Sequence, residues 1–491
     1  MSNSYILTLR LKTNDIEDEI LNKMFNITCH TKNIIIKHVI KSIRRLERDK
    51  SYLNLQEIYK KNKKFTKNEK DLRNSLIRKY GLTSFDLQSY ALKQSSLYKG
   101  QLHSHIAQKC AKDISNAVDR YLFKNGKMIH FKKNKNHLSF ENKNNNTGIV
   151  FKDNKVYLSY LKEKLEIPAF IRKNDLFAKK ALNDKIKFCR IIRKYHKHKY
   201  RYYIQLCLEG TSPKDYKMGK GKVGIDIGPS TIAYVSDNKI NIKELGSNVN
   251  SIESEIENLN IKLDKLRRIN NPQNYNEDGT IKKDTKTFKK FWYKSNNQKL
   301  TEDKLKYLYQ KRSEKLKYSH NVLAKEILKL GNEFIVEDMN YQALAKRSKR
   351  TEISEKTGRY KSKKRFGKSI ANHAPSMLVT RLKTLVKYNN GKLRKVNCFK
   401  TAATQFDHIS GEFIKHELNE RFIELSNNDI IQRDLHSAFN LKYILQNKDE
   451  YSYDVENMFE DYDNFKNQHD TCINELIQMK NEGIKIPSSI I

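Results

Sequence analysis

The sequence predicts a protein of mixed α/β and α+β class, divided into two lobes. An alternating apolar pattern near the amino terminus is followed by a long, highly charged helical region, and strand-like sequence returns near residue 127. A polar stretch at 212–222 has the composition of a linker, and a second series of strands and helices follows it. A chain of 491 residues accommodates this division, because domains average roughly 150 residues.

The first lobe begins with a strand at residues 5–9, in which apolar and polar side chains alternate. Asn14 and Asp15 are candidate caps for the helical region that follows, and Ile16, Ile20 and Met24 are expected along one face of its first helix. Helical periodicity continues to about residue 125, with lysine clusters that are typical of solvated faces and loops.

Residues 185–210 predict a β-hairpin whose exposed face is rich in Arg, Lys and Tyr. Tyrosine is a good strand former, so any single ring can be structural, but basic residues interleaved with rings also suit a nucleic-acid surface. A second basic segment, at 343–369, lacks an apolar period and is expected to be a mobile loop. The residues expected to bind nucleic acid are Arg193, Lys194, Lys197, Lys199, Arg201, Lys346, Arg347, Lys349 and Arg350.

The composition indicates a polyanionic partner. The chain has 97 Lys and Arg residues against 56 Asp and Glu, which gives a formal net charge of +41. Nucleic acid, an anionic membrane face and a disordered basic tail are the candidates. The charge is spread along the whole chain among apolar residues, which disfavours a tail, so nucleic acid is the preferred partner.

Neither a membrane nor a secretory route is expected. No stretch approaches the length of about 18 apolar residues that a spanning helix needs, and residues 1–15 lack the apolar region and cleavage site of a signal peptide. We therefore expect a cytoplasmic protein. The six cysteines include no CxxC pair, so neither a disulfide framework nor a structural zinc site is expected.

The second lobe is expected to open with a strand that runs into a glycine turn at 222–228. Two charged helices are predicted at roughly 249–269 and 299–330, the second beginning at Thr301 and ending at Gly331. Its leucines and isoleucines keep helical spacing and are interpreted as packing residues. A strand is predicted in "EFIVEDMN", before the basic segment.

Three carboxylates lie where an isolated acid needs an explanation. Asp226 is in an apolar strand-like segment, where an unpaired ionised carboxylate costs several kcal/mol. Glu337 ends the apolar run 334–336, although a glutamate at a strand end can simply meet solvent. Asp434 lies at the start of a predicted helix and, taken alone, is interpreted as its N-cap.

One arrangement accounts for all three carboxylates. If the first hairpin, the later strand and the late helix form one RNase H-like sheet with a helix packed on it, Asp226, Glu337 and Asp434 converge. Such oxygen ligands suit Mg²⁺ or Mn²⁺, and two of these ions can activate a water and stabilise the leaving oxygen of a phosphodiester. The three residues are therefore predicted metal ligands.

A second enzyme class shares part of this pattern. The stretch "GIDIGPSTIAYV" also resembles the first phosphate loop of the actin and sugar-kinase ATPase fold. That fold needs a second Asp-x-Gly loop and a glycine-rich adenosine contact, whereas "IVEDMN" and "QRDLHSAF" contain no glycine. A strongly basic surface also suits a small-nucleotide kinase poorly, so we exclude this class.

The motifs taken together resemble the TnpB-type proteins, RNA-guided nucleases of insertion sequences that are historically labelled transposases and are related to the small type V CRISPR effectors. "GIDIGPSTIAYV" resembles their first RuvC motif, "FIVEDMN" the second and "QRDLHSAFNL" the third, in the same order and roughly a hundred residues apart. The resemblance covers most of the chain. It implies that Asp226, Glu337 and Asp434 are the catalytic carboxylates of a DNA endonuclease.

The resemblance also implies a domain plan and partners. Residues 1–13 and 127–215 are expected to form a mixed β-barrel (wedge), with a helical recognition insert at 14–126. Residues 219–491 are expected to form a split RuvC nuclease domain with a degenerate zinc-finger-like insert near 400–430. The implied partners are a guide RNA and the target DNA, and the implied cofactor is Mg²⁺ or Mn²⁺.

The chain departs from the family pattern in two places. The insert near 400–430 has no cysteine, so we predict no zinc, and His408 and His416 are interpreted as polar surface residues. His436 replaces the usual Asn and is interpreted as a helix-surface histidine with an ordinary hydrogen bond. The acidic stretch at 448–463 is open to two interpretations, a solvated helix face or an internal mimic of phosphate.

Three alternatives stay open on sequence alone. A type V CRISPR effector would have nearly the same features, and only a neighbouring repeat array would separate the two. A guided repressor that does not cleave would bind the same partners, although the intact carboxylates disfavour it. A transposase that joins DNA ends is the historical label, but the sequence has no convincing tyrosine or serine recombinase pattern. The oligomeric state is not predicted.

Overall fold

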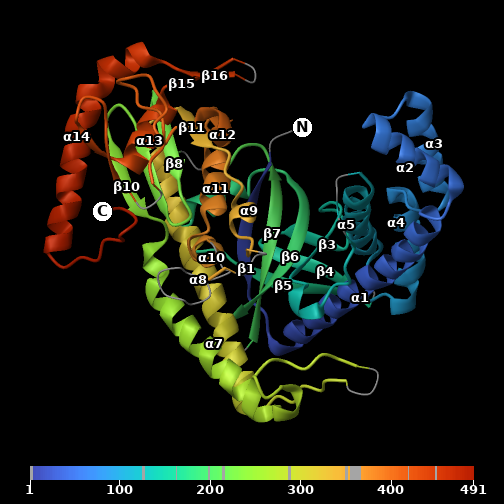
Figure 1. The fold of residues 1–491 in the computed structure, drawn as a ribbon. Coiled ribbons are helices and arrows are strands. Elements are labelled where there is room, and N and C mark those ends of the chain that lie inside the picture. Colours follow the sequence, from blue (N-terminus) through green and yellow to red (C-terminus); the bar gives the residue numbers. More distant parts are fainter. Residues whose placement is uncertain are drawn as a thin grey trace. The chain divides into compact units, whose positions relative to one another are not determined.

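The computed structural model describes all residues except 1–3, 124–125, 127, 162, 197–198, 213–215, 286–288, 349–351, 354–365, 418–419 and 448–449. The chain divides into two compact units, Met1–Lys214 and Asp215–Ile491, and the division falls in the polar stretch 212–222 (Figure 1). Both units mix helices and strands. Within the described part of the chain, every helix is too short or too polar to cross a lipid bilayer.

The first unit contains a seven-stranded sheet with the order β2-β6-β7-β1-β5-β4-β3, in which all neighbours are antiparallel. The sheet curls, because β3 also contacts β6. The hairpin predicted at 185–210 is confirmed as β6 and β7. The strands are β1 (Ser4–Leu11), β2 (Ser139–Glu141), β3 (Ile149–Lys152), β4 (Lys155–Tyr160), β5 (Glu163–Phe170), β6 (Ile186–His196) and β7 (Lys199–Glu209).

Most helices of the first unit lie between β1 and β2. Of the two candidate caps, Asn14 is confirmed and Asp15 is the first helical residue. The Asn14 side chain accepts a hydrogen bond from the Glu17 amide, and the Glu17 carboxylate accepts one from the Asn14 amide. The helices are α1 (Asp15–Leu46), α2 (Lys50–Asn62), α3 (Lys67–Lys79), α4 (Ser84–Ser95), α5 (Ser104–Phe123) and α6 (Leu176–Ala181), with 3₁₀ turns at Ser96–Tyr98 and Asn134–Asn136.

Two sequence-based predictions for this unit are wrong. Ile16 is 71% exposed while Met24 is buried, because residues four apart drift by about 40° around a helix and the buried stripe follows Met24 and Phe25. Residue 127 lies outside the described residues, and among the described residues that follow it the first strand begins at Ser139. The Lys132 backbone instead exchanges two hydrogen bonds with the Asn33 side chain of α1, which ties this segment to a helix.

The second unit contains a five-stranded sheet with the order β10-β9-β8-β11-β12. The first three strands are antiparallel, and β8, β11 and β12 are parallel. The two small sheets, β13-β14 and β15-β16, have two strands each. The strands are β8 (Lys222–Ile227), β9 (Thr231–Val235), β10 (Ile240–Glu244), β11 (Glu333–Glu337), β12 (Lys392–Val396), β13 (Phe422–Glu424), β14 (Ile430–Gln432), β15 (Ile444–Asn447) and β16 (Glu450–Tyr453).

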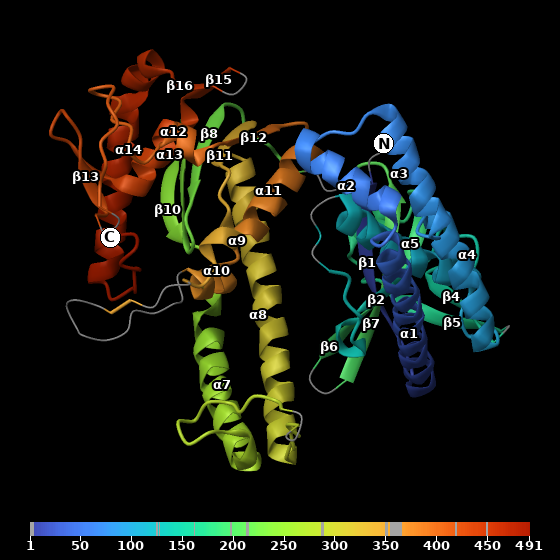
Figure 2. The same ribbon diagram turned by 45° about the vertical axis from the view of Figure 1, so that its right-hand side comes forward.

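Helices cover both faces of this sheet. One apolar cluster joins β9 and β10 to α13 and α14, and another joins β8 and β11 to α8 and α11. Figures 1 and 2 show α7 and α8 side by side and α14 along β10. The helices are α7 (Asn250–Asn270), α8 (Asn296–Leu328), α9 (Tyr341–Leu344), α10 (Gly367–His373), α11 (Pro375–Tyr388), α12 (Cys398–Thr401), α13 (Arg433–Lys442) and α14 (Val455–Asn481), with 3₁₀ turns at Ser247–Val249 and Pro272–Asn274.

The start of α8 differs from the prediction. The helix begins at Asn296, and Ser295 is its N-cap, with its side chain accepting a hydrogen bond from the Gln298 amide. Thr301 lies inside the helix, where its hydroxyl donates to the Asn297 carbonyl oxygen at 2.8 Å. The sequence contains the signal for the true start, because Ser295 and Gln298 have the spacing of a capping box.

Candidate active site

Asp226 and Glu337 lie on neighbouring parallel strands. Val336 of β11 is opposite Ile225 of β8, so the two carboxylates follow the same rung of the ladder. Side chains alternate along a strand, and Val223, Ile225, Phe334 and Val336 pack toward α8 and α11. Asp226 and Glu337 therefore lie on the opposite face, which is the face covered by α13.

Gly224 lets α13 pack directly on this face. A Cβ on Gly224 would overlap the Ala438 carbonyl oxygen and come within 2.5 Å of the Lys442 amide nitrogen. A glycine inside a strand is typical of such close backbone approach. The contact holds the helix against β8, so the first turn of α13, which contains Asp434, is directed toward the end of the strand.

Asp434 is not the N-cap of α13, contrary to its interpretation as an isolated residue. Gln432 is the cap, and its side-chain oxygen accepts a hydrogen bond from the Leu435 amide at 2.8 Å. Asp434 lies within the first turn, where the positive end of the helix dipole favours a carboxylate. Arg433 contacts it, with 3.2 Å between Arg433 Nη2 and Asp434 Oδ1.

The three carboxylates influence one another electrostatically. Burial raises the pKa of Asp226 well above its ordinary value, and the negative charges of Asp434 and Glu337 raise it further. Burial also raises the pKa of Glu337 to about 7. The negative charge gathered at this end of β8 and β11 is therefore only partly compensated by the groups around it.

Ser437 and Arg433 are the groups that favour ionised Asp226, and both lower its pKa. Ser437 lies three residues after Asp434, on the same side of α13, and its buried hydroxyl makes no hydrogen bond of normal geometry. Tyr341 lies near Asp226 and Glu337, and its hydroxyl donates to the Ile227 carbonyl oxygen at 3.0 Å. Sequence reasoning did not single out these three residues, although Arg433 and Ser437 flank Asp434 in the quoted motif.

The three carboxylates do not form a ready-made metal site in this structure. Among the residues that the structure describes, no three His, Cys, Asp or Glu side chains are arranged to hold a metal ion. Asp226, Glu337 and Asp434 are thus brought to one end of the sheet, close enough to shift a pKa, without forming a coordination sphere. Their role as metal ligands stays a prediction.

The described residues that were predicted to bind nucleic acid lie on the hairpin of β6 and β7 and in the segment after α9. Lys194 is opposite Arg201 in the ladder, Lys194 and Lys199 are exposed, and the Lys194 ammonium lies 4.9 Å from the Tyr203 ring centre. Lys346 and Arg347, after α9, are also exposed. The remaining predicted residues Lys197, Lys349 and Arg350 lie outside the described residues.

Arg193 lies in the interior and not on the exposed face. It is 4% exposed, because it pairs with Tyr202 on the side of the hairpin that packs on α1. Its guanidinium donates to the carbonyl oxygens of His137 and Asn134 at 3.1 and 2.7 Å, and lies 4.4 Å from the Phe25 ring centre. These contacts give Arg193 a structural role.

His408 and His436 form a buried pair, so the expectation that they lie on the surface is wrong. Their exposed fractions are 0% and 1%, and 3.3 Å separates His408 Nδ1 from His436 Nε2. Burial lowers the pKa of His408 to about 4 and that of His436 to about 3. The cysteine-free insert packs His408 against the Phe439 ring of α13. His416 is partly exposed, 3.8 Å from Glu420.

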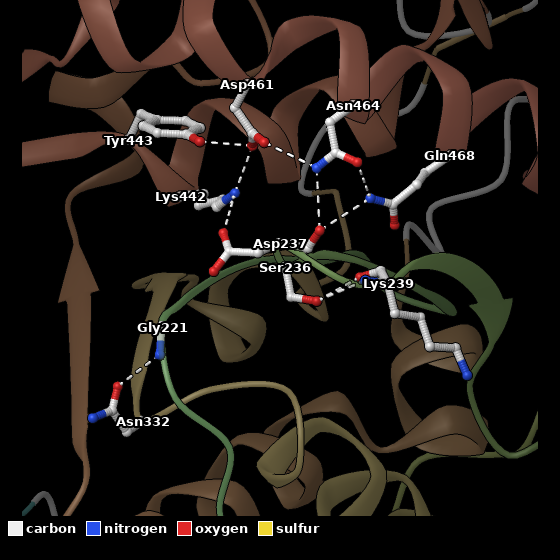
Figure 3. A network of polar contacts seen from close by, with 10 residues as sticks. All are labelled: Gly221, Ser236, Asp237, Lys239, Asn332, Lys442, Tyr443, Asp461, Asn464 and Gln468. Carbon is white, nitrogen blue, oxygen red and sulfur yellow. Dashed lines mark hydrogen bonds and ion pairs between the residues drawn. The ribbon is translucent and has the colours of Figure 1, made fainter.

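The acidic stretch contributes a buried ion pair (Figure 3). The ammonium of Lys442, 3% exposed at the end of α13, lies 2.6 Å from an Asp461 oxygen of α14 and 2.7 Å from an Asp237 oxygen after β9. Asn464 and Gln468 donate to the Asp237 carbonyl oxygen, each at 3.1 Å. Asp461 therefore attaches α14 to the sheet. Glu456, Glu460 and Asp463 of the same stretch are exposed, in agreement with a solvated helix face.

The comparisons with known proteins give no family. No protein-family model and no curated protein match the chain. Among solved structures, it is similar to a Cas12f1–sgRNA–target DNA complex, with a TM-score of 0.45, 11% identity, and coverage of 90% of this chain and 99% of that one. A CRISPR–Cas12f ternary complex gives a TM-score of 0.27 and 13% identity over 89% and 98%. At this level, neither likeness gives a role to any residue of this chain.

Proposed function

We propose that the second unit is a divalent-metal-dependent endonuclease that hydrolyses DNA phosphodiesters, with Asp226, Glu337 and Asp434 as its catalytic carboxylates. The observation that carries this proposal is the meeting of three partly buried carboxylates at one end of the sheet, where partial burial and the charges of Asp434 and Glu337 raise the pKa of Asp226. A partly buried cluster of like charges is unfavourable unless a partner compensates it, and perturbed carboxylates of this kind concentrate at functional sites.

The donor set fits a hard divalent cation. Carboxylate oxygens from two strands and a helix are the ligands that Mg²⁺ and Mn²⁺ prefer. When bound, such ions supply an activated water and stabilise the charge on the leaving oxygen. Sharing an ion requires the three side chains to turn toward one another from their present positions, while β8, β11 and α13 hold their backbones in place. We propose no zinc in the cysteine-free insert.

The chain's own residues set the positions of these groups. Gly224 fixes the distance between β8 and α13, Arg433 contacts Asp434, and Ser437 faces Asp226. The strand order, with three antiparallel strands followed by two parallel ones, supports an RNase H-like (RuvC) sheet. The combination supports metal-dependent phosphodiester chemistry at a fixed site, and joined DNA ends among the products would indicate a strand-joining transposase instead of hydrolysis.

The proposed partners are a guide RNA and a target DNA that pairs with it. The net charge of +41 and the exposed Lys194, Lys199, Lys346 and Arg347 support polyanion binding. The guide is inferred from the resemblance of the motifs to TnpB-type proteins, in which base pairing reads the sequence and protein reads backbone shape. The alternative is a type V CRISPR effector, which would carry out the same reaction.

Cleavage of a labelled DNA duplex tests the proposal. The full chain is purified with its bound RNA, that RNA is sequenced, and a DNA complementary to it is incubated with the complex and Mg²⁺. We expect cleavage by the wild type, none by Asp226→Ala, and wild-type cleavage by Asp338→Asn, a control carboxylate that forms a surface ion pair with Lys395. Equal product from wild type and Asp226→Ala, or random cellular RNA in the complex, would contradict the proposal and favour a protein that only binds.

A further inference from the structure

The segment that joins α7 to α8, residues 271–295, lies at the far end of this helix pair from the sheet (Figure 2). The two helices pack on each other through an apolar cluster of their own, formed by Ile252, Ile256, Leu263, Leu305 and Leu308. The connecting segment is therefore carried on a well-packed support, away from the three carboxylates.

Two buried asparagines fix part of this segment. Asn271 donates to the Tyr293 carbonyl oxygen at 3.0 Å and accepts a hydrogen bond from the Tyr293 amide at 2.6 Å. Asn274 donates to the Phe291 carbonyl oxygen at 2.7 Å. Both asparagines are 0% exposed, so these hydrogen bonds are shielded from water and hold the backbone of Phe291 and Tyr293 in place.

Three consecutive aromatic side chains project from this fixed backbone. Phe291 is 74% exposed and Tyr293 58%, whereas Trp292 is 37% exposed and meets the Tyr275 ring edge-on, with 5.9 Å between ring centres. Large rings held in water on a fixed backbone are unfavourable for a free surface and mark a binding site. We name Phe291, Trp292 and Tyr293 the aromatic tip.

The charge around the aromatic tip indicates the kind of ligand. Between residues 281 and 299 the sequence has seven lysines and one aspartate. Two of these lysines are paired, Lys290 with Asp284 at 2.8 Å and Lys294 with Glu302 at 2.6 Å. Lys283, Lys289 and Lys299 are exposed. Rings among excess cations complement a polyanion that carries flat apolar groups, and an apolar protein partner would not need the lysines.

We propose that the aromatic tip binds single-stranded nucleic acid, with Phe291 and Tyr293 stacking on unpaired bases and the neighbouring lysines contacting phosphates. Paired bases are already stacked within a duplex, so the tip favours single strands. This inference deepens the proposed function, on which it rests for the ligand class, and adds a contact remote from the carboxylates. Single-stranded DNA and RNA present the same chemistry to the rings.

The chain contains its own reporter for this contact, because Trp292 is its single tryptophan. Oligo(dT) and oligo(U) of fifteen nucleotides are titrated separately into the full chain in EDTA, so that binding is measured without hydrolysis. We expect the Trp292 fluorescence to be quenched as bases stack on the tip, and the affinity to fall with salt. The two oligonucleotides separate DNA binding from RNA binding.

The double variant Phe291→Ala/Tyr293→Ala tests the rings while keeping the reporter. Base stacking predicts a loss of affinity of about fivefold or more for each ring, together with loss of the quench. Phe291→Tyr/Tyr293→Phe keeps both rings and is expected to bind normally. Tyr318→Ala removes a ring that is 70% exposed elsewhere on α8 and is the matched control. All four proteins are checked by circular dichroism.

Two outcomes would overturn the inference. One is a double variant that binds the oligonucleotides with wild-type affinity and still shows the quench of Trp292 fluorescence. The other is a change in particle mass by light scattering without a change in oligonucleotide binding, which would make the tip a protein contact. The oligonucleotide titrations are made in EDTA and do not depend on hydrolysis, so failure of the nuclease proposal and failure of this one are distinguished.

Discussion

Gly224 of β8 touches Ala438 of α13 so closely that the strand has no room for a side chain at this position. We expect Gly224→Ala to push the helix away and lower the free energy of unfolding by about 1 to 3 kcal/mol, measured by urea denaturation. Because Asp434 moves with the helix, DNA cleavage is expected to be lost as well.

Gly483→Ala is the control for this change. Gly483 has a φ of +84° and open space around it, so alanine strains the backbone by about 1 to 2 kcal/mol without moving α13. We expect it to cleave DNA as the wild type does. Wild-type cleavage by Gly224→Ala would contradict the role given to this contact.

Divalent cations are expected to stabilise the folded protein through the three carboxylates. Mg²⁺ relieves the repulsion that raises the pKa of Asp226, and a ligand at ten times its Kd stabilises by about 1.4 kcal/mol. Thermal unfolding with and without Mg²⁺ measures this. We expect the rise in Tm in the wild type and in Asp338→Asn, and its disappearance in Asp226→Asn. An equal rise in Asp226→Asn would place the ion elsewhere.

The His408 imidazole is expected to make stability depend on pH. Its pKa is lowered by burial to about 4, so the unfolded chain binds a proton that the folded one does not as pH falls below 6.5. The contribution of His408 to the free energy of unfolding is fully present above pH 6.5. It is lost as the pH falls toward 4, by on the order of 3 kcal/mol. The groups that face His408 are Asp407, His436 and Tyr462.

Urea denaturation at pH 7.5 and pH 4.5 checks this dependence. His408→Phe keeps an apolar ring among its aromatic neighbours and is expected to lose less stability on acidification than the wild type. His416→Phe is the control, because His416 is partly exposed and is expected to leave the pH dependence unchanged. Identical pH dependence in wild type and His408→Phe would assign the effect to other groups.

The Lys442 ion pairs are expected to stabilise the attachment of α14. Lys442→Met leaves the Asp461 carboxylate without its cation, and removing one partner of a buried pair costs roughly 3 to 5 kcal/mol. Asp237→Asn removes the partner that is 54% exposed and is expected to cost about 1 kcal/mol or less. Urea denaturation of both variants measures the difference. Equal losses of unfolding free energy in the two variants would show that burial does not determine how much each ion pair stabilises the protein.

Neighbouring residues of β6 are expected to respond differently. Arg193→Ala removes the buried guanidinium and its hydrogen bonds, so we expect a loss of stability of about 2 kcal/mol or more. Lys194→Ala is expected to have the same free energy of unfolding as the wild type. It is expected to bind nucleic acid more weakly, with an affinity that depends less on salt. Binding at several salt concentrations, together with urea denaturation, separates the two. Weaker binding with normal stability in Arg193→Ala would contradict its structural role.

Local patterns in the sequence predicted much of the second unit. The apolar alternation around Asp226 and Glu337 is enough to place both on strands, and Gly224 itself indicates a close backbone approach. The pairing of β8 with β11 follows from the single sheet that the three motifs require. The sequence pattern does not give the distances between the three carboxylates. These distances depend on the side-chain rotamers, which are set by the packing around each residue.

Other features depend on contacts between distant segments. Arg193 and Lys194 look alike in sequence, and only the side of the hairpin that meets α1 decides which is buried. His408 and His436 are 28 residues apart, and nothing local indicates that the insert folds over α13. The fixed backbone of the aromatic tip likewise depends on two asparagines that precede it by about twenty residues.

The late position of α13 in the chain has a consequence for the synthesis of the protein. The chain emerges from the ribosome at roughly 5 to 20 residues per second, so Asp434 follows Asp226 by on the order of 10 to 40 s. During that interval β8 and β9 are available, but the carboxylate cluster cannot exist. The proposed nuclease site is therefore incomplete until nearly all of the chain has been translated.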